Sequence, residues 1–260
     1  MGEFFKSNTY FRDLYKYKDL PIYETDEFDF YRCVPFDDAF YRKNVSTLHD
    51  GNLRYSPGRY SKLFPGQKLS YWADSPATSR AEVKKHNKTN NLLTFWAYDD
   101  SSSTFPTMGN DEILRIVDGR KFGLKELIDK IDKGLNISAD EKRLMQNIME
   151  QSPDCLVYDS VARKGGENFI FLEKGFKKLA IRELRLRLGN RKAKNEATIL
   201  CAGTSDYSPY LEKYACFFEP IARVGMDKSY FNSEEYSFRK ANMDVAVERK
   251  SNFLREKRGD

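Results

Sequence analysis

Histidine and metal-ligating clusters are scarce in this 260-residue sequence, which has two histidines, His49 and His86, and four cysteines. No His-Glu-x-x-His segment and no Cys/His group at zinc spacing occurs, so we expect no metal site. The glycine-rich segments that bind nucleotide phosphates are missing, and neither histidine lies near a Gly-x-Ser-x-Gly turn. These absences disfavour zinc enzymes, the common nucleotide-binding folds and Ser-His-Asp hydrolases.

Long hydrophobic runs are also missing. No apolar stretch approaches the length of a membrane-spanning helix, and no charged leader precedes an apolar segment, so we expect a cytoplasmic protein without membrane association. The cysteines form no Cys-x-x-Cys pair, and three lie in apolar stretches, which favours reduced core residues. The four are Cys33, Cys155, Cys201 and Cys216.

The chain has enough apolar residues to form a core. Hydrophobic residues make up 40% of it and aromatic residues 14%. We expect an α+β protein with a helical extension over residues 1–27, a principal domain over 28–189 and a C-terminal extension over 190–260 that packs on it. The helix of the first extension is predicted because four apolar residues share one helical face. They are Phe4, Phe11, Leu14 and Tyr15.

Local patterns predict further elements. Ser75 followed by Pro76 is a helix start, and Ser138 with Glu141 forms a capping box at the start of another helix. A third helix is predicted from residue 124 to Gly134. Alternating or β-branched runs predict strands near 30–35, 69–73, 92–98, 112–117, 155–161, 168–172 and 184–188.

Four segments contain the residues on which a functional prediction can be based. The first is Tyr31-Arg32, and the second is RYSP at 54–57 or GRYS at 58–61. The third is YWADSPATSRAE at 71–82, and the last is DCLVYDSVARKGGENFIF at 154–171. In this order they resemble the RES domain, a family known from bacterial toxin–antitoxin pairs, although serine replaces the asparagine of the family's second motif.

The resemblance implies an ADP-ribosyltransferase-like mixed sheet with flanking helices. It also implies a toxin that cleaves NAD between nicotinamide and ribose, with NAD as substrate and no bound cofactor. Water or phosphate would be the acceptor, and an ADP-ribosyltransferase acting on a protein is the alternative. A neutralising antitoxin is the expected partner, and a homo-oligomer stays open.

The same resemblance assigns roles that suit this chemistry. Nicotinamide leaves as a neutral molecule, so the reaction needs no general acid, and Glu82 would stabilise the oxocarbenium-like ribose or orient the nucleophile. Arg32 and either Arg54 or Arg59 would bind the diphosphate. Tyr71 would stack on the cationic nicotinamide, and Ser160 would hydrogen-bond a ribose hydroxyl or the carboxamide.

Structural roles compete with each assignment, because single glutamates and arginines usually face solvent and a tyrosine in a strand is usually core. The excess of basic residues behind the net charge of +5 lies largely after residue 182, so a noncatalytic nucleic-acid-binding protein is a further alternative. A solvated surface explains these charges better, and nucleic acid is not the expected partner. The aromatics of that alternative are Tyr207, Tyr210, Tyr214, Phe217 and Phe218.

Overall fold

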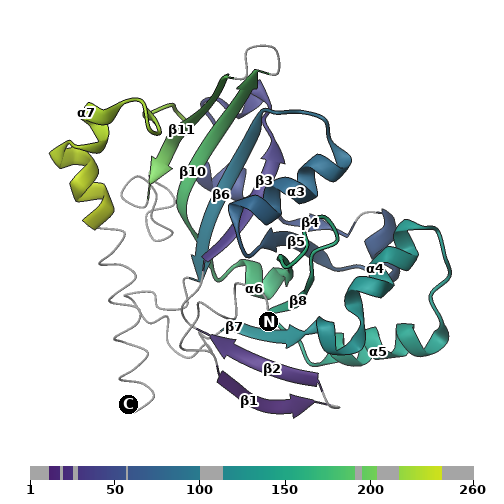
Figure 1. The fold of residues 1–260 in the computed structure, drawn as a ribbon. Coiled ribbons are helices and arrows are strands. Elements are labelled where there is room, and N and C mark those ends of the chain that lie inside the picture. Colours follow the sequence, from purple (N-terminus) through teal and green to yellow (C-terminus); the bar gives the residue numbers. More distant parts are fainter. Residues whose placement is uncertain are drawn as a thin grey trace, which may run out of the picture.

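The protein is a mixed α+β structure built on one large sheet (Figure 1). The computed structural model describes residues 12–17, 20–25, 29–56, 58–99, 114–190, 195–203 and 217–241. The strands are β1 (Arg12–Tyr17), β2 (Leu20–Thr25), β3 (Asp29–Pro35), β4 (Arg54–Tyr55), β5 (Lys68–Ala73), β6 (Leu92–Asp99), β7 (Leu114–Asp118), β8 (Cys155–Asp159), β9 (Glu167–Leu172), β10 (Leu179–Asn190), β11 (Asn195–Gly203) and β12 (Ala222–Arg223).

The twelve-stranded sheet follows the order β1-β2-β7-β8-β9-β5-β3-β6-β10-β11-β12, with β4 paired beside β5. Among the described strand pairs only β7 and β8 run parallel. The sheet is weakest between β5 and β3, which share the single register pair Tyr31 and Ala73. In Figure 1, β3 and β10 run up the view and β6 runs down between them, while β1, β2 and β7 cross its lower part, so the sheet turns strongly between its halves.

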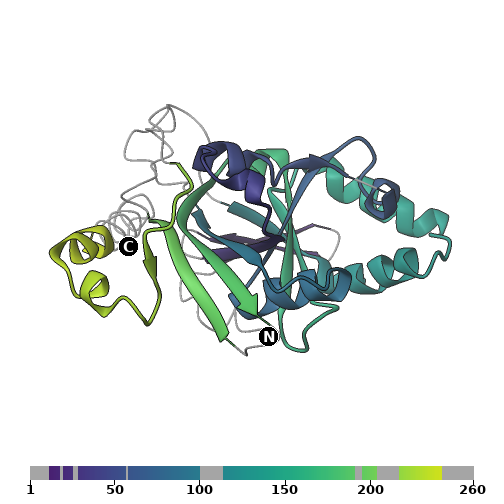
Figure 2. The same cartoon turned by 90° about the horizontal axis from the view of Figure 1, so that it is seen from above.

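Helices lie at the edges and on both faces of this sheet, and α4 and α5 stand far from α7 when the molecule is seen from above (Figure 2). No helix in the described ranges is long and apolar enough to cross a membrane. The helices are α2 (Val45–Asp50), α3 (Pro76–His86), α4 (Leu124–Asp132), α5 (Ala139–Glu150), α6 (Glu173–Phe176) and α7 (Lys228–Phe231), with short 3₁₀ turns η1 (Asp38–Phe40), η2 (Gly58–Lys62) and η3 (Gly119–Phe122).

The predicted helix starts are confirmed. Ser75 caps α3 by accepting from the backbone N–H of Thr78, with Pro76 at the first helical position. Ser138 and Glu141 exchange both hydrogen bonds of the capping box at the start of α5. These local signals hold because each satisfies backbone donors that a helix start leaves unpaired.

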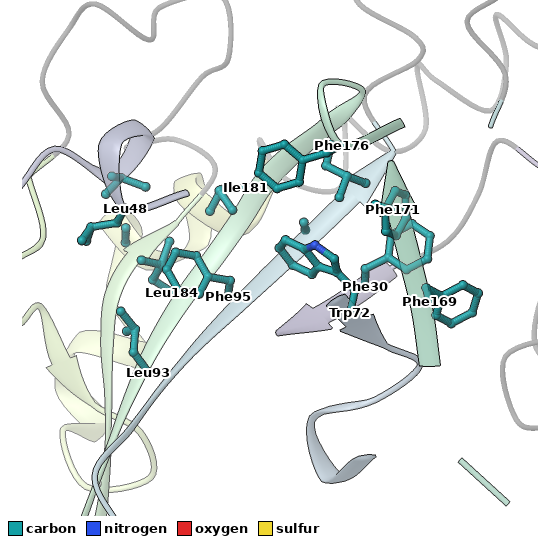
Figure 3. Close-up of a cluster of buried hydrophobic side chains, with 14 of the residues drawn as sticks. Phe30, Leu48, Trp72, Leu93, Phe95, Phe169, Phe171, Phe176, Ile181 and Leu184 are labelled. Atoms are coloured by element: carbon teal, nitrogen blue, oxygen red, sulfur yellow. The ribbon is translucent and has the colours of Figure 1, made fainter. Parts of the chain in front are cut away.

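The core occupies both faces of the sheet, and β9 contributes to both because all six of its residues are buried. Phe169 and Phe171 point into one cluster with Phe30 and Trp72 (Figure 3). Ile170 and Leu172 belong to a second cluster, which also contains residues of α4 and α5. The period of two in a strand produces this division, and a strand buried on both sides fixes the middle of the sheet.

The N-terminal helix is a wrong prediction where the structure describes the segment. Residues 12–17 form β1, which pairs with β2, and β2 pairs with β7. Phe4 and Phe11 lie outside the described residues. Leu14 and Tyr15 stand in a strand because β1 pairs along β2, with a register shift between Asp13 and Tyr15, and this pairing outweighs a helical pattern of only a few apolar residues.

The C-terminal region adds to the same sheet instead of standing apart. β11 pairs with β10 over eight register pairs, and β12 pairs with β11. Phe218 is fully buried in the first core cluster, whereas Phe217 is half exposed. Residues 207–214, which carry the other aromatics of the nucleic-acid alternative, lie outside the described residues.

Candidate functional site

A cavity of about 470 Å³ opens where β3 and β5 diverge. The edge of β5 that faces away from β9 pairs with β4 at its start and with β3 only at its end. The gap between these pairings leaves the middle of β5 open to side chains. The cavity is lined by Tyr31, Arg32, Cys33, Pro35, Tyr60, Tyr71, Trp72, Ala73, Ser79, Glu82, Val83, His86, Asn87, Tyr158 and Asn168.

Glu82 projects from the second turn of α3 into this cavity and is held by donors from the other side of the fold. Its Oε1 accepts from the Ser160 hydroxyl at 2.6 Å and from the Asn168 amide at 2.6 Å, with a longer contact of 3.3 Å from the N–H of Ala162. Within the described residues Oε2 receives no hydrogen bond. One carboxylate oxygen is therefore anchored while the other is available to a ligand.

Ser160 is itself fixed by the turn that follows β8. Its hydroxyl oxygen accepts from the N–H groups of Ala162 at 3.2 Å and Arg163 at 3.0 Å while the hydroxyl donates to Glu82. Ser160 is only 5% exposed and does not line the cavity. The hydroxyl of Ser160 is therefore bound to the glutamate in this structure, and its contact with a substrate stays a prediction.

The same turn is hydrogen-bonded to the start of α3 and packs against it. The guanidinium of Arg163 donates to the hydroxyls of Ser75 and Thr78, both at 3.0 Å. Gly166 packs so closely on Thr78 that an added Cβ would lie 2.5 Å from its hydroxyl oxygen. Any larger residue at Gly166 would push the helix away, so the glycine keeps Glu82 within reach of Ser160.

Arg32 fills the gap between the diverging strands. Its guanidinium donates to the carbonyl of Tyr71 at 2.6 Å and to the side-chain oxygen of Asn52 at 2.8 Å. Burial, and after it the positive charge of Arg54, lowers the pKa of Arg32 to about 10. Two guanidinium groups close enough to repel each other form a place where an anion would be stabilised.

Tyrosines form the wall opposite Arg32. The rings of Tyr60 and Tyr71 lie 4.8 Å apart at an angle of 39°. Tyr158 is buried, and burial raises its pKa well above the ordinary value, with Tyr60, Glu82 and Tyr71 raising it further. The phenol therefore stays protonated and serves as a neutral hydrogen-bonding group.

Some of the predicted site residues lie at the cavity and others do not. The structure brings Arg32, Tyr71 and Glu82 to one cavity and places Ser160 directly behind Glu82. Arg54 is exposed, and its guanidinium donates to the carbonyl of Gly51 at 2.9 Å. The side chain of Arg59 lies outside the described residues.

Asn168, Tyr158 and Tyr60 also line the cavity, and sequence reasoning assigned none of them to the site. A sequence signal was present for Tyr158, because it lies two residues before Ser160 and therefore on the same face of an extended segment. The pairing of Asn168 with Tyr158 depends on the register of β8 and β9. Tyr60 lies in a 3₁₀ turn, where no periodicity indicates a direction.

The two histidines lie in different places, because His86 lines the cavity whereas His49 is in the core. His49 stacks on Phe176 in the core, and burial lowers its pKa to about 3, so the ring stays neutral. No group of three or more His, Cys, Asp or Glu that could hold a metal ion occurs in these ranges. Cys33, Cys155 and Cys201 are free and buried, as predicted, and Cys216 lies outside the described residues.

Comparisons of this chain with protein families, with curated proteins and with solved structures found no match. The geometry of the cavity and the resemblance of its segments are therefore the grounds for a functional assignment.

Proposed function

We propose that this protein cleaves NAD at the bond between nicotinamide and ribose and that its fold is ADP-ribosyltransferase-like. The observation that carries the proposal is the placement of Glu82, Arg32 and Tyr71 around one cavity, with Ser160 bound to the glutamate. Residues from three distant segments, to which the RES resemblance assigns roles in the reaction, converge there. A cavity of this volume lies in the range of small-molecule sites.

The chemistry requires a negative group beside the anomeric carbon. As the glycosidic bond breaks, its electron pair leaves with the nicotinamide nitrogen, and positive charge develops on the ribose. Water then adds, and a proton is released, which gives nicotinamide and ADP-ribose. Glu82 would stabilise the developing charge through its free oxygen Oε2, because the anchored Oε1 holds the carboxylate in a fixed orientation.

The remaining residues account for binding. Arg32, with Arg54 beside it, would stabilise the diphosphate. Tyr71 and Tyr60 offer aromatic surface for the cationic nicotinamide ring. Depletion of NAD would harm the host cell, so the proposal includes an antitoxin protein that neutralises the enzyme. It also implies that expression of this chain without the antitoxin arrests growth.

The decisive experiment replaces Glu82 with glutamine and measures nicotinamide release from NAD by the purified full chain. Glu82→Gln keeps an oxygen to accept from Ser160 and Asn168 but removes the negative charge. We expect turnover to fall by roughly two to three orders of magnitude, the effect of losing one electrostatic stabiliser, while the melting temperature changes little. Glu150→Gln, an exposed position on α5, is the matched control.

Product analysis separates the acceptors. Free ADP-ribose indicates water, a phosphorylated ADP-ribose indicates inorganic phosphate, and a mass increment on a protein indicates ADP-ribosyl transfer. Release of nicotinamide by Glu82→Gln at the wild-type rate would exclude the catalytic role of Glu82. An inactive wild-type chain with an intact fold would count against the proposed function itself.

A further inference from the structure

A second cavity, of about 350 Å³, lies beside the first and shares Tyr31 as a wall. It forms where α3 meets the face of the sheet opposite the first core cluster. Register pairs place its side chains together, because Thr94 lies opposite Arg185 and Arg187 lies opposite Thr198. The lining residues are Tyr31, Pro76, Arg80, Thr94, Trp96, Glu183, Arg185, Arg187 and Thr198.

Positive charge dominates this cavity. Three arginines line it against one carboxylate, Glu183. Arg185 is paired with Glu183, and Arg187 is paired with Glu196 at the rim. Arg80 makes no hydrogen bond or ion pair with any residue that the structure describes, although it is partly buried.

The arginines also repel one another. Burial lowers the pKa of Arg187, and the charge of Arg80 lowers it further. Cations gathered in a concave, partly desolvated place raise the free energy of the protein unless an anion compensates them. Glu183 and Glu196 compensate Arg185 and Arg187, so Arg80 is the arginine of this lining that has no carboxylate partner among the described residues.

We propose that this second cavity binds a phosphate group, carried by inorganic phosphate or by a small phosphate monoester. A phosphate offers more acceptor oxygens than a carboxylate, so it can bind Arg80 and a neighbouring guanidinium group at once, and the planar guanidinium groups match its oxygens with paired donors. The hydroxyls of Thr94 and Thr198 supply further donors on the same face. This site is distinct from the Arg32 pair, and the assignment is independent of the NAD-cleaving function.

Calorimetric titration of the full chain, without NAD, tests this site with three probes: inorganic phosphate, ribose 5-phosphate and acetate. We expect saturable binding of one or both phosphates and at least tenfold weaker binding of acetate. Tighter binding of ribose 5-phosphate would assign a monoester as the ligand, and tighter binding of inorganic phosphate would assign the free ion. Absence of saturable binding by both phosphates would overturn the proposal.

Variants locate the binding. Arg80→Gln breaks no contact in the described structure, and we expect it to weaken phosphate binding at least tenfold with an unchanged melting temperature. Glu183→Gln removes the only carboxylate of the lining and should tighten binding several-fold, a gain that a damaged fold would not produce. Arg143→Gln, on the exposed side of α5, should bind as the wild type does.

Two results would contradict the assignment. Wild-type affinity in Arg80→Gln would show that the phosphate does not occupy this cavity. Loss of binding in Arg54→Gln with retention in Arg80→Gln would place the phosphate beside Arg32 in the first cavity. Because no NAD is present, these results leave the proposed cleavage reaction untouched.

Discussion

The carboxylates of Glu82 and Glu167 have opposite surroundings. Glu167 is fully buried, and Arg120 binds it at 2.7 Å while also binding the buried Asp118 through two nitrogen atoms. Glu82 lines a cavity and receives hydrogen bonds from neutral donors alone. Within the described residues it has no ion pair.

This difference indicates which carboxylate serves stability and which is available for binding. A buried charge with a cation partner is compensated inside the protein, and breaking the pair exposes the full desolvation penalty. A carboxylate oriented by hydroxyl and amide groups keeps its negative charge uncompensated at the cavity. A cationic ligand or transition state would then be stabilised there.

The largest expected effect comes from breaking the buried network. Arg120→Met leaves Asp118 and Glu167 without their shared cation, so we expect the free energy of unfolding to fall by about 3–5 kcal/mol. Urea denaturation measures it, with the exposed Arg143→Met as control. An unchanged free energy of unfolding would mean that the Arg120 network contributes no more to stability than the hydrogen bonds around Glu82.

We expect a smaller effect from replacing Ser160, whose hydroxyl binds Glu82. Ser160→Ala removes the hydroxyl that orients the carboxylate, and a hydrogen bond to a charged group contributes about 1.5–3 kcal/mol. We expect kcat for nicotinamide release to fall roughly tenfold to a hundredfold with little change in KM, because Ser160 does not line the cavity.

Ser160→Thr keeps a hydroxyl and should restore much of the lost turnover. A rise in KM with unchanged kcat would instead show that Ser160 contacts the substrate, as the sequence led us to predict. A fall in melting temperature without any change in kcat would reduce Ser160 to a structural residue.

Local signals in the sequence predicted local structure well. The cap at Ser75 and the capping box at Ser138 depend only on neighbouring residues, and both helices begin where predicted. The helix prediction for residues 12–17 failed because a short segment with apolar and charged residues fits either a helix or a strand. Pairing with β2 selects the strand. All of β11 was missed for a similar reason, since its pairing with β10 is a tertiary contact.

The site was predictable only as a set of residue types. Glu82 and Ser160 were identified as members, but their mutual hydrogen bond depends on a contact across 78 residues of chain. The cavity exists because β5 pairs with β3 at a single position, which no periodicity reveals. Asn168 went unassigned because its direction toward Glu82 follows from the register of β9.

The smallest expected effect separates the two arginines that the second motif leaves open. Arg54 is exposed but near enough to Arg32 to lower its pKa, so its charge reaches the first cavity partly screened by solvent. Arg54→Ala should therefore raise KM for NAD about threefold to tenfold with kcat nearly unchanged, since a lost phosphate contact weakens binding of the ground state and transition state alike. Added salt should reduce the difference from wild type, because screening already weakens an exposed charge. Arg59→Ala should change KM less, and the reverse order would assign the diphosphate contact to Arg59.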